Sequence, residues 1–253
     1  MNVANQLWHT DGTYGRPRAD ISFLLSRVVP PRDGETEYCD TRHAYDLLSA
    51  PMRERVNPLF AYHSITHSRT LTGSKLEDWD PLTLNTFPPV RRPVVHIHAG
   101  SGRKALCVAS HIETIEGYTY EESQQLVHYL IDIATGPGCV YTHEWQVGDL
   151  LLWDNTCAMH RVRPYDDFVH VRQLVGTRTE RGRSTLPTYN GRVWLSSIIT
   201  RTFRSAYLPN GSMSRSGNPT VETTLNQWRQ SAILLPANHP LCVARFNTTR
   251  LRR

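Results

Sequence analysis

Short apolar runs separated by turn residues dominate the pattern along this chain. Residues 19–29 form an apolar run of strand length that stops at Pro30-Pro31, because proline cannot continue the hydrogen-bond ladder of a sheet. Further short runs occur at 93–98, 105–109, 139–143 and 149–153. Most of them are separated from the next run by a segment that contains glycine. The pattern predicts a core built mainly from β-strands.

Two segments instead show the spacing of a helix. Asp40-Thr41 opens the first, which we expect to run to Leu48. In the second, Thr119 and Glu122 match a capping box, and Gly136 ends the apolar stripe that follows. The chain therefore predicts an α+β fold, mainly β, with a few helices packed outside the sheets.

Composition narrows the class of protein. The chain has 253 residues, of which 39% are hydrophobic, enough for one sizeable core. We find neither an apolar run of membrane-spanning length nor a leader of the secretory type, so no membrane partner is expected. The five cysteines form no Cys-x-x-Cys pair, which argues against a disulfide framework or a zinc site and favours a cytoplasmic location.

Charge is divided unevenly between two parts of the chain. Residues 181–253 hold eleven arginines, no lysine and one acid, Glu222, which gives +10, and the total of +5 leaves −5 for residues 1–180. We expect residues 1–180 to be the functional domain and residues 181–253 to be a basic, poorly ordered extension. Nucleic acid is not the expected partner, although a nucleic-acid arm stays open as an alternative.

The candidate chemistry lies in two distant segments. His9 and Asp11 would point the same way on a β-strand, because side chains two residues apart share a face. His160, far along the chain, would add a second imidazole. Two histidines and one carboxylate are the ligand set of a mononuclear non-haem iron(II) site. By itself the triplet is a weak signal, because chance produces it in a chain with twelve histidines.

The segments around these residues make the signal specific. Residues 5–14, 30–40, 98–104 and 148–155, taken in this order, closely resemble blocks of the TauD/TfdA family of Fe(II)/2-oxoglutarate-dependent dioxygenases. Within that family the chain is most similar to the branch of 2,4-dichlorophenoxyacetate dioxygenase. The resemblance implies a double-stranded β-helix, or jelly roll, of the clavaminate-synthase-like type. It also implies that His9, Asp11 and His160 hold Fe(II).

The resemblance further implies a site for the cosubstrate 2-oxoglutarate. Arg172, twelve positions after His160, matches the family arginine that anchors the far carboxylate, and Thr36 matches a threonine that touches it. A guanidinium suits this task because its planar fork of donors grips a carboxylate with two hydrogen bonds. Residues 169–175 are rich in β-branched residues and predict a strand that holds Arg172 rigidly. Arg178 is the alternative anchor.

The function expected from the resemblance is hydroxylation of a small organic substrate, with a carboxylate as its expected acidic group. Molecular oxygen is the other reactant, succinate and carbon dioxide are the products of the cosubstrate, and a homo-oligomer is an open possibility. Only eight residues precede His9, whereas the resemblance implies further strands there, so we expect an N-terminally truncated member. The alternatives are an inactive remnant of such an enzyme and a basic-tail binding protein that reuses the scaffold.

Overall fold

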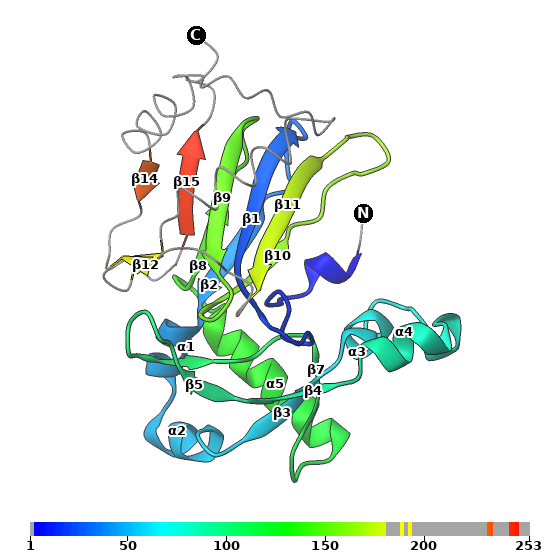
Figure 1. Cartoon of the computed structure of the whole chain (residues 1–253), viewed down its shortest axis with the longest axis vertical. Helices are drawn as coiled ribbons and strands as arrows, with labels where there is room; N and C mark the ends of the chain where they lie inside the picture. Colours follow the sequence, from blue (N-terminus) through cyan, green and yellow to red (C-terminus); the bar gives the residue numbers. More distant parts are fainter. Residues whose placement is uncertain (1–2, 181–187, 190–191, 194–231, 235–242, 248–253) are drawn as a thin grey trace.

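Two antiparallel sheets carry the segments singled out above, and Figure 1 shows strands β11, β1, β9 and β15 of the larger one side by side. The larger sheet has the order β11-β1-β9-β15-β14 and the smaller the order β10-β2-β8. The structure is a computed structural model and describes residues 3–180, 188–189, 192–193, 232–234 and 243–247. The strands are β1 (Ala19–Val28), β2 (Thr36–Asp40), β8 (Val140–His143), β9 (Asp149–Asp154), β10 (Ala158–Val162), β11 (Gln173–Glu180), β14 (Ala232–Leu234) and β15 (Val243–Asn247).

The two sheets share an apolar core. Tyr38 and Ala158 come from the smaller sheet, Leu151 and Trp153 come from the larger one, and Trp145 lies in the connection between them. All five side chains are less than a tenth exposed. Two antiparallel sheets packed over a common core are what the jelly-roll prediction requires.

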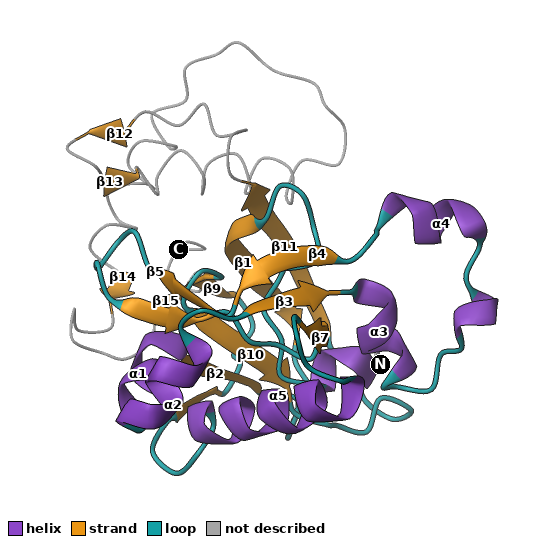
Figure 2. Cartoon of the chain, turned by 90° about the horizontal axis from the view of Figure 1, so that it is seen from below, coloured by secondary structure: helices purple, strands orange, loops and turns teal. Residues whose placement is uncertain are grey.

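The rest of the described chain surrounds this pair of sheets. Figure 2 shows α1, α2 and α5 gathered along one side. A three-stranded sheet of order β4-β3-β7 and a hairpin of β5 and β6 lie in the same half of the molecule as these helices (Figure 1). The elements are η1 (Val3–Gln6), α1 (Thr41–Leu47), α2 (Ala50–Val56), β3 (Phe60–His63), α3 (Ile65–Thr70), η2 (Leu76–Asp78), α4 (Pro81–Thr86), β4 (Val90–Pro93), β5 (Val95–Ile97), β6 (Lys104–Leu106), β7 (Ile112–Ile115), α5 (Tyr120–Ala134), β12 (Thr188–Tyr189) and β13 (Arg192–Val193).

The longer predicted elements are confirmed. The apolar run at 19–29 forms β1, and the two predicted helices are α1 and α5. Asp40 caps α1 by accepting from two backbone N–H groups, and Thr119 and Glu122 form the capping box of α5. Helices α2, α3 and α4, each of six or seven residues, were not predicted.

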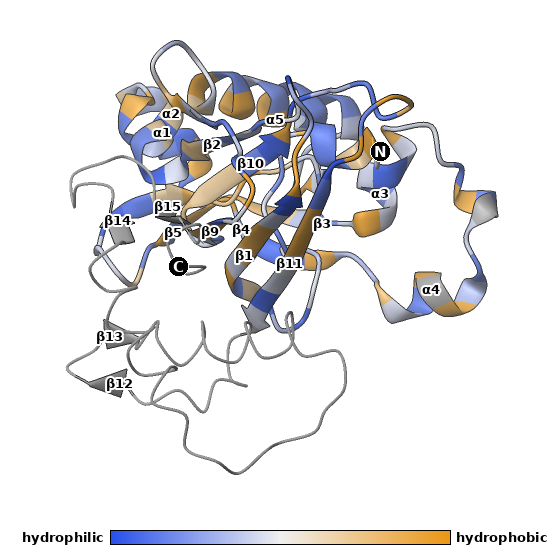
Figure 3. Cartoon of the chain, turned by 90° about the horizontal axis from the view of Figure 1, so that it is seen from above, coloured by the Kyte–Doolittle hydropathy of each residue, from blue (hydrophilic) through white to orange (hydrophobic). Residues whose placement is uncertain are grey.

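A second apolar core lies beneath the helices. Leu126, Val127 and Leu130 of α5 pack with Ile112 and Ile115 of β7, and all five are buried. This is the face that the apolar stripe of the sequence predicted. Figure 3 shows orange, apolar residues interleaved with blue, polar ones along β1 and the helices, and it shows α4 projecting away from the body of the molecule.

The predicted basic extension, 181–253, falls mainly outside the described residues. Its described parts are β12 to β15. Strand β15 runs antiparallel to β9, with Val243 opposite Trp153 and Asn247 opposite Asp149. In the described part of the chain, no helix combines the length and the apolar character that crossing a membrane requires.

Candidate metal centre

His9 and His160 meet at the edge of the smaller sheet. The backbone N–H of each residue donates to the carbonyl oxygen of the other, at 3.0 and 2.8 Å, so the pair forms an isolated antiparallel bridge beside β10. Side chains of directly opposed residues lie on the same face of a sheet. The centroids of the two imidazole rings are consequently 4.2 Å apart, and both residues are buried.

Asp11 follows this bridge in a turn. The prediction that His9 and Asp11 share a face of one β-strand is wrong in this detail, since the segment makes a single bridge and then turns. Gly12 has a φ of +69°, and a Cβ there would lie 2.7 Å from the backbone nitrogen of Ala19, so the turn requires glycine. The carboxylate still reaches the histidines: its Oδ1 lies 4.0 Å from Nε2 of His9, and its Oδ2 lies 4.0 Å from Nε2 of His160.

The protonation states favour binding of a cation. Nδ1 of His9 lies 2.7 Å from the carbonyl oxygen of Leu7, which can only accept, so in the neutral imidazole Nδ1 carries the hydrogen and Nε2 has the lone pair. Burial and the neighbouring His9 lower the pKa of His160 to about 3, although Asp11 opposes them. Burial opposes ionisation of Asp11, but the two imidazoles, a hydrogen bond from Ser22 and the charge of Arg178 outweigh it and lower its pKa.

These three side chains fit a metal ion better than they fit one another. Separations of 4.0 Å are too long for hydrogen bonds, and Nδ1 of His160 is buried without a hydrogen-bond partner among the described residues. Their ligand atoms lie within 4.8 Å of one another, which suits one first-row ion with bonds of about 2 Å. We call this group the cavity cluster: His9, Asp11 and His160.

One cavity of about 410 Å³ connects the cavity cluster with the predicted cosubstrate residues. The cluster and the pair Thr36 and Arg172 line the same space. The structure thus brings together all five residues that the sequence singled out, from segments far apart in the chain. Its wall also includes Asn5, Ser22, Phe23, Leu24, Trp153, Val162, Leu174, Gly176, Thr177 and Arg178.

Arg172 is held in a fixed direction by hydrogen bonds. Its Nε donates to the carbonyl oxygen of Gly34 at 2.8 Å, and one of its Nη atoms donates to Oγ1 of Thr36 at 3.1 Å. Thr36 also accepts from Nε1 of Trp145 at 2.9 Å. The predicted strand at 169–175 is wrong in its bounds, because β11 begins at Gln173, so these contacts hold Arg172 in place of a strand.

Both members of this pair can still bind an anion. Arg172 uses two of its five N–H donors, and burial lowers the pKa of Arg172 from an ordinary value so high that the guanidinium stays charged. The two donors that reach the Thr36 hydroxyl occupy its lone pairs, so its own proton is available to an acceptor. The pair therefore presents N–H and O–H donors to the cavity.

Three residues of the site had no firm role in the sequence analysis. Ser22 and Asn155 contact Asp11, and Arg178, expected only as an alternative to Arg172, lines the cavity. One signal existed for Ser22: it is a polar residue inside the apolar run that forms β1, and such a residue, when buried, needs a partner. Asn155 stands in a block that resembles the family, but no pattern indicated its contact.

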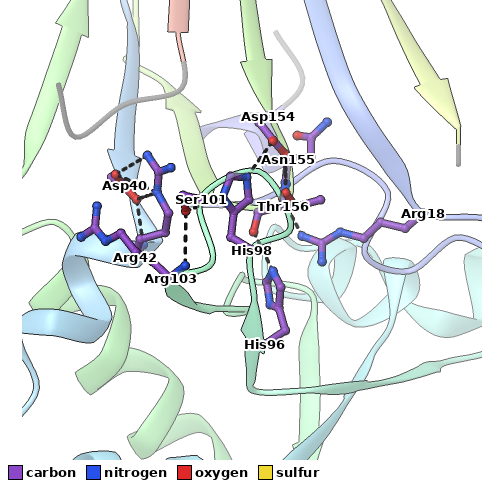
Figure 4. A network of polar contacts seen from close by, with 10 residues as sticks. All are labelled: Arg18, Asp40, Arg42, His96, His98, Ser101, Arg103, Asp154, Asn155 and Thr156. Atoms are coloured by element: carbon purple, nitrogen blue, oxygen red, sulfur yellow. Dashed lines mark hydrogen bonds and ion pairs between the residues drawn. The ribbon is translucent and has the colours of Figure 1, made fainter. Parts of the chain in front are cut away.

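A second group of ligand-type side chains lies at the opposite end of β9 from the turn at Gly148, and Figure 4 shows the polar contacts around it. Nε2 of His98 lies 3.0 Å from Oδ2 of Asp154, and Nδ1 of His98 lies 2.8 Å from Oγ of Ser101. His98 and Arg103 stand in the block at 98–104 that resembles the family, but neither is part of the cavity wall, and Arg103 pairs with Asp46. We call this group the loop cluster: His98, Asp154 and Cys157.

Comparisons with known proteins agree with this geometry. A family model described as taurine catabolism dioxygenase TauD, TfdA family matches residues 1–178. The alpha-ketoglutarate-dependent 2,4-dichlorophenoxyacetate dioxygenase of Burkholderia sp. (strain RASC) is 41% identical over 194 residues, which cover 77% of this chain and 64% of that protein. The (S)-phenoxypropionate/alpha-ketoglutarate-dioxygenase of Sphingobium herbicidovorans is 37% identical over 166 residues, which cover 64% and 58%. The chain thus spans less than two thirds of either relative.

Solved structures share the fold. The crystal structure of AAD-2 in complex with Mn(II) and N-oxalylglycine matches with a TM-score of 0.67 and 34% identity, covering 74% of this chain and 72% of that one. The structure of a putative alpha-ketoglutarate dependent 2,4-D dioxygenase from Burkholderia xenovorans matches with a TM-score of 0.68 and 36% identity, covering 72% and 70%. These matches confirm the predicted jelly-roll fold. Since the family model also covers more than half of its residues, the chain belongs to the TauD/TfdA family.

Proposed function

We propose that this chain is an Fe(II)- and 2-oxoglutarate-dependent dioxygenase that hydroxylates a small organic acid. The observation that carries the proposal is that the cavity cluster and the pair Thr36 and Arg172 line one cavity. When bound, the ferrous ion would supply the activation of oxygen, and 2-oxoglutarate would supply two electrons by its decarboxylation to succinate. The protein residues contribute binding and orientation.

The cavity cluster holds the metal with one charge and two lone pairs. Asp11 contributes the charge and stays ionised near neutral pH because its pKa is lowered. His160 stays neutral because burial lowers its pKa to about 3. Since three protein ligands do not fill the coordination sphere of a six-coordinate ion, the remaining positions are left to small molecules.

Thr36 and Arg172 bind the carboxylate of 2-oxoglutarate that lies away from the metal. Gly34 and Trp145 fix the two side chains before the ligand arrives, so little side-chain entropy is lost on binding. A guanidinium and a hydroxyl also match a carboxylate, which accepts at both oxygens. The pair therefore sets the orientation of the cosubstrate relative to the metal.

Arg178 supports an acidic substrate. Its side chain is exposed at the wall of the cavity, and its positive charge acts on Asp11 strongly enough to contribute to the lowered pKa of that carboxyl. Both relatives named above carry a phenoxy carboxylic acid in their names. We therefore place a carboxylate-bearing substrate in this cavity, next to the metal and within the field of Arg178.

The first test is an anaerobic titration of the metal-free protein with Fe(II) and then with 2-oxoglutarate. We expect the weak visible charge-transfer band of the chelate, which the free components lack. Aerobic reactions with 2,4-dichlorophenoxyacetate, phenoxypropionates and, as sulfur-acid controls, taurine and a sulfate ester would then be followed by succinate release. Absence of the band and of metal binding would overturn the proposal and favour an inactive relative of the enzymes.

The proposal includes association of the chain into a homo-oligomer and a cytoplasmic location. Leu76 and Leu82, near and on the projecting α4, are 56% and 76% exposed, which favours association of copies of the chain. Light scattering of the purified protein measures this. The cysteines among the described residues, Cys39, Cys107, Cys139 and Cys157, are free thiols, which suits the reducing cytoplasm.

A further inference from the structure

The protein holds only one of the two carboxylate oxygens of Asp11. Oγ of Ser22 donates to Oδ2 at 2.7 Å. Oδ1 has no hydrogen-bond donor among the described residues, and its nearest charged-type neighbour is Nε2 of His9 at 4.0 Å. The two oxygens, chemically equivalent in a free carboxylate, are therefore distinguished by their surroundings.

The direction of the hydrogen bond from Ser22 is fixed by a chain of donors and acceptors. The indole Nε1 of Trp153 can only donate, and it donates to Oδ1 of Asn155 at 2.9 Å. The amide nitrogen of Asn155 must then face away, and it donates to Oγ of Ser22 at 2.8 Å. Since Ser22 accepts there, its own proton is left for Oδ2 of Asp11.

Asn155 also closes this chain into a ring. Its Oδ1 accepts from the backbone N–H of Asp11 at 3.3 Å, so the side chain and the backbone of Asp11 are both tied to the same partners. The ring consists of Asp11, Ser22 and Asn155, and Trp153 sets its polarity. Reversing any one bond would leave two donors or two acceptors facing each other, which costs free energy in a buried place.

The residues that support Asp11 are buried, and their arrangement depends on the pairing of two central strands. Ser22 of β1 lies directly opposite Trp153 of β9 in the sheet register. Ser22, Trp153 and Asn155 are each no more than 2% exposed, so water does not replace these bonds. Ser22 and Trp153 stand on neighbouring strands and Asn155 directly follows β9, so the register of the sheet sets their positions and makes them rigid supports.

We propose that Ser22 and Asn155 are positioning residues that decide which oxygen Asp11 presents to the metal. The inference rests on the proposed function and deepens it. With Oδ2 engaged by Ser22, only Oδ1 is free to ligate, so Asp11 binds through one oxygen and leaves room for the cosubstrate. Without this bond the carboxylate rotates about a broad torsion and can bind through both oxygens.

The test compares Ser22→Ala with wild type by titrating the metal-free protein with Co²⁺. We expect about 10- to 100-fold weaker binding, the usual effect of losing a hydrogen-bond partner of a metal ligand. The visible spectrum of bound Co²⁺, whose intensity depends on coordination number, should change as well. Ser22→Thr keeps the hydroxyl on a strand position that tolerates a branched residue, and it should restore both the affinity and the spectrum.

Ser26→Ala is the matched control. Ser26 lies on the same strand, is equally buried, and accepts from the backbone N–H of Asp149 at 2.9 Å, but it is not part of the cavity wall. Both alanine variants remove one buried hydroxyl, so both should lower the melting temperature of the metal-free protein by a similar amount. Only Ser22→Ala should alter Co²⁺ binding.

A Ser22→Ala protein that binds Co²⁺ with the affinity and spectrum of Ser26→Ala overturns the inference. Should Ser22→Ala fail to fold, Asn155→Ala serves in its place, because the Ser22 hydroxyl then loses its donor and can turn away from Asp11. Wild-type affinity in Asn155→Ala would also overturn it. Wild-type protein that binds no metal at all overturns the proposed function. If wild-type protein binds Co²⁺ and the Ser22 and Asn155 variants bind it equally well, this inference alone is overturned.

Discussion

The cavity cluster and the loop cluster each contain three ligand-type side chains, including a histidine and an aspartate, and they differ in how their polar atoms are hydrogen-bonded. In the loop cluster both ring nitrogens of His98 have hydrogen-bond partners, at 2.8 and 3.0 Å. Thr156 donates through its backbone N–H to the remaining oxygen of Asp154 at 2.7 Å. In the cavity cluster the imidazoles stand 4.0 Å from the carboxylate.

This difference separates a structural contact from a binding site. A buried donor or acceptor that is already paired gains little from an added ion, whereas an unpaired one pays a desolvation cost until a partner arrives. The loop cluster fastens the turn after β9 to the loop between β5 and β6 (Figure 4). The side chains of the cavity cluster line the cavity, where a bound ion can reach them. A search for three neighbouring ligand-type side chains would find both groups, and only their hydrogen bonds separate them.

The largest expected effect comes from removing a histidine from each cluster. His160→Ala should weaken Fe(II) or Co²⁺ binding by more than about 100-fold, because it deletes a metal ligand. This is a larger effect than the loss of a hydrogen-bond partner of a ligand, as in Ser22→Ala. His98→Ala should leave metal affinity unchanged and lower the free energy of unfolding by about 1–3 kcal/mol, because Asp154 loses a partner. Metal titration and denaturant unfolding of both variants measure this, and equal loss of metal by the two would erase the distinction.

Next in size is the effect of Arg172→Ala on the cosubstrate. Loss of a charged, pre-oriented donor should weaken 2-oxoglutarate binding to the metal-loaded protein by about 10- to 100-fold and leave metal affinity unaltered. Arg103→Ala is the control, since Arg103 pairs with Asp46 outside the cavity. The charge-transfer band gives the 2-oxoglutarate affinity of both variants, and titration with Co²⁺ gives their metal affinity. Undiminished 2-oxoglutarate binding in Arg172→Ala would remove this residue from the site.

Acid should destabilise the metal-free protein through the buried, neutral His160. Its pKa is about 3 in the folded state and 6.5 as the ordinary value, so the unfolded state binds more protons between these limits and stability falls as the pH drops. At pH 5 this histidine alone should cost about 2 kcal/mol relative to neutral pH. Urea unfolding at pH 7 and pH 5 with a chelator should therefore show a smaller difference in His160→Gln than in wild type. An identical difference would mean that His160 is protonated in the fold.

The smallest effect concerns the hydroxyl that orients His98. Ser101→Ala removes one hydrogen bond to Nδ1 of His98 and should cost about 1 kcal/mol of stability. The loop cluster keeps its bond between His98 and Asp154, and the cavity cluster is untouched. Thermal unfolding of the variant measures the loss of stability, and Co²⁺ titration checks that the cavity cluster is unchanged. A change in Co²⁺ affinity would show that the clusters are coupled through β9.

The sequence allowed the ligand residues to be predicted because each stands in a block with a recognisable pattern. It could not show why they converge. The prediction assigned His9 and Asp11 to one strand, whereas a backbone bridge places His9 and a glycine turn places Asp11. Arg172 was predicted inside a strand and lies just before it, because side-chain bonds to Gly34 and Thr36, invisible in the pattern, fix it.

The supporting residues could not be predicted for a related reason. Ser22 and Asn155 lie far apart in the sequence, and only the register of β1 against β9 brings them together. Hydrophobic patterns predict that strands exist and which face is buried, but they do not fix which residue stands opposite which. The difference between the two clusters is of the same kind, since it depends on hydrogen-bond distances and not on residue types.

Strand β15 makes the arginine-rich end of the chain part of the larger sheet, which lines the cavity. By pairing with β9 it occupies backbone donors and acceptors of the strand that carries Trp153. Cutting the chain after residue 180 would leave those backbone groups unpaired at a free sheet edge, which can pair with strands of other molecules. A chain shortened in this way to simplify crystallisation would then aggregate through the sheet edge beside the proposed metal site.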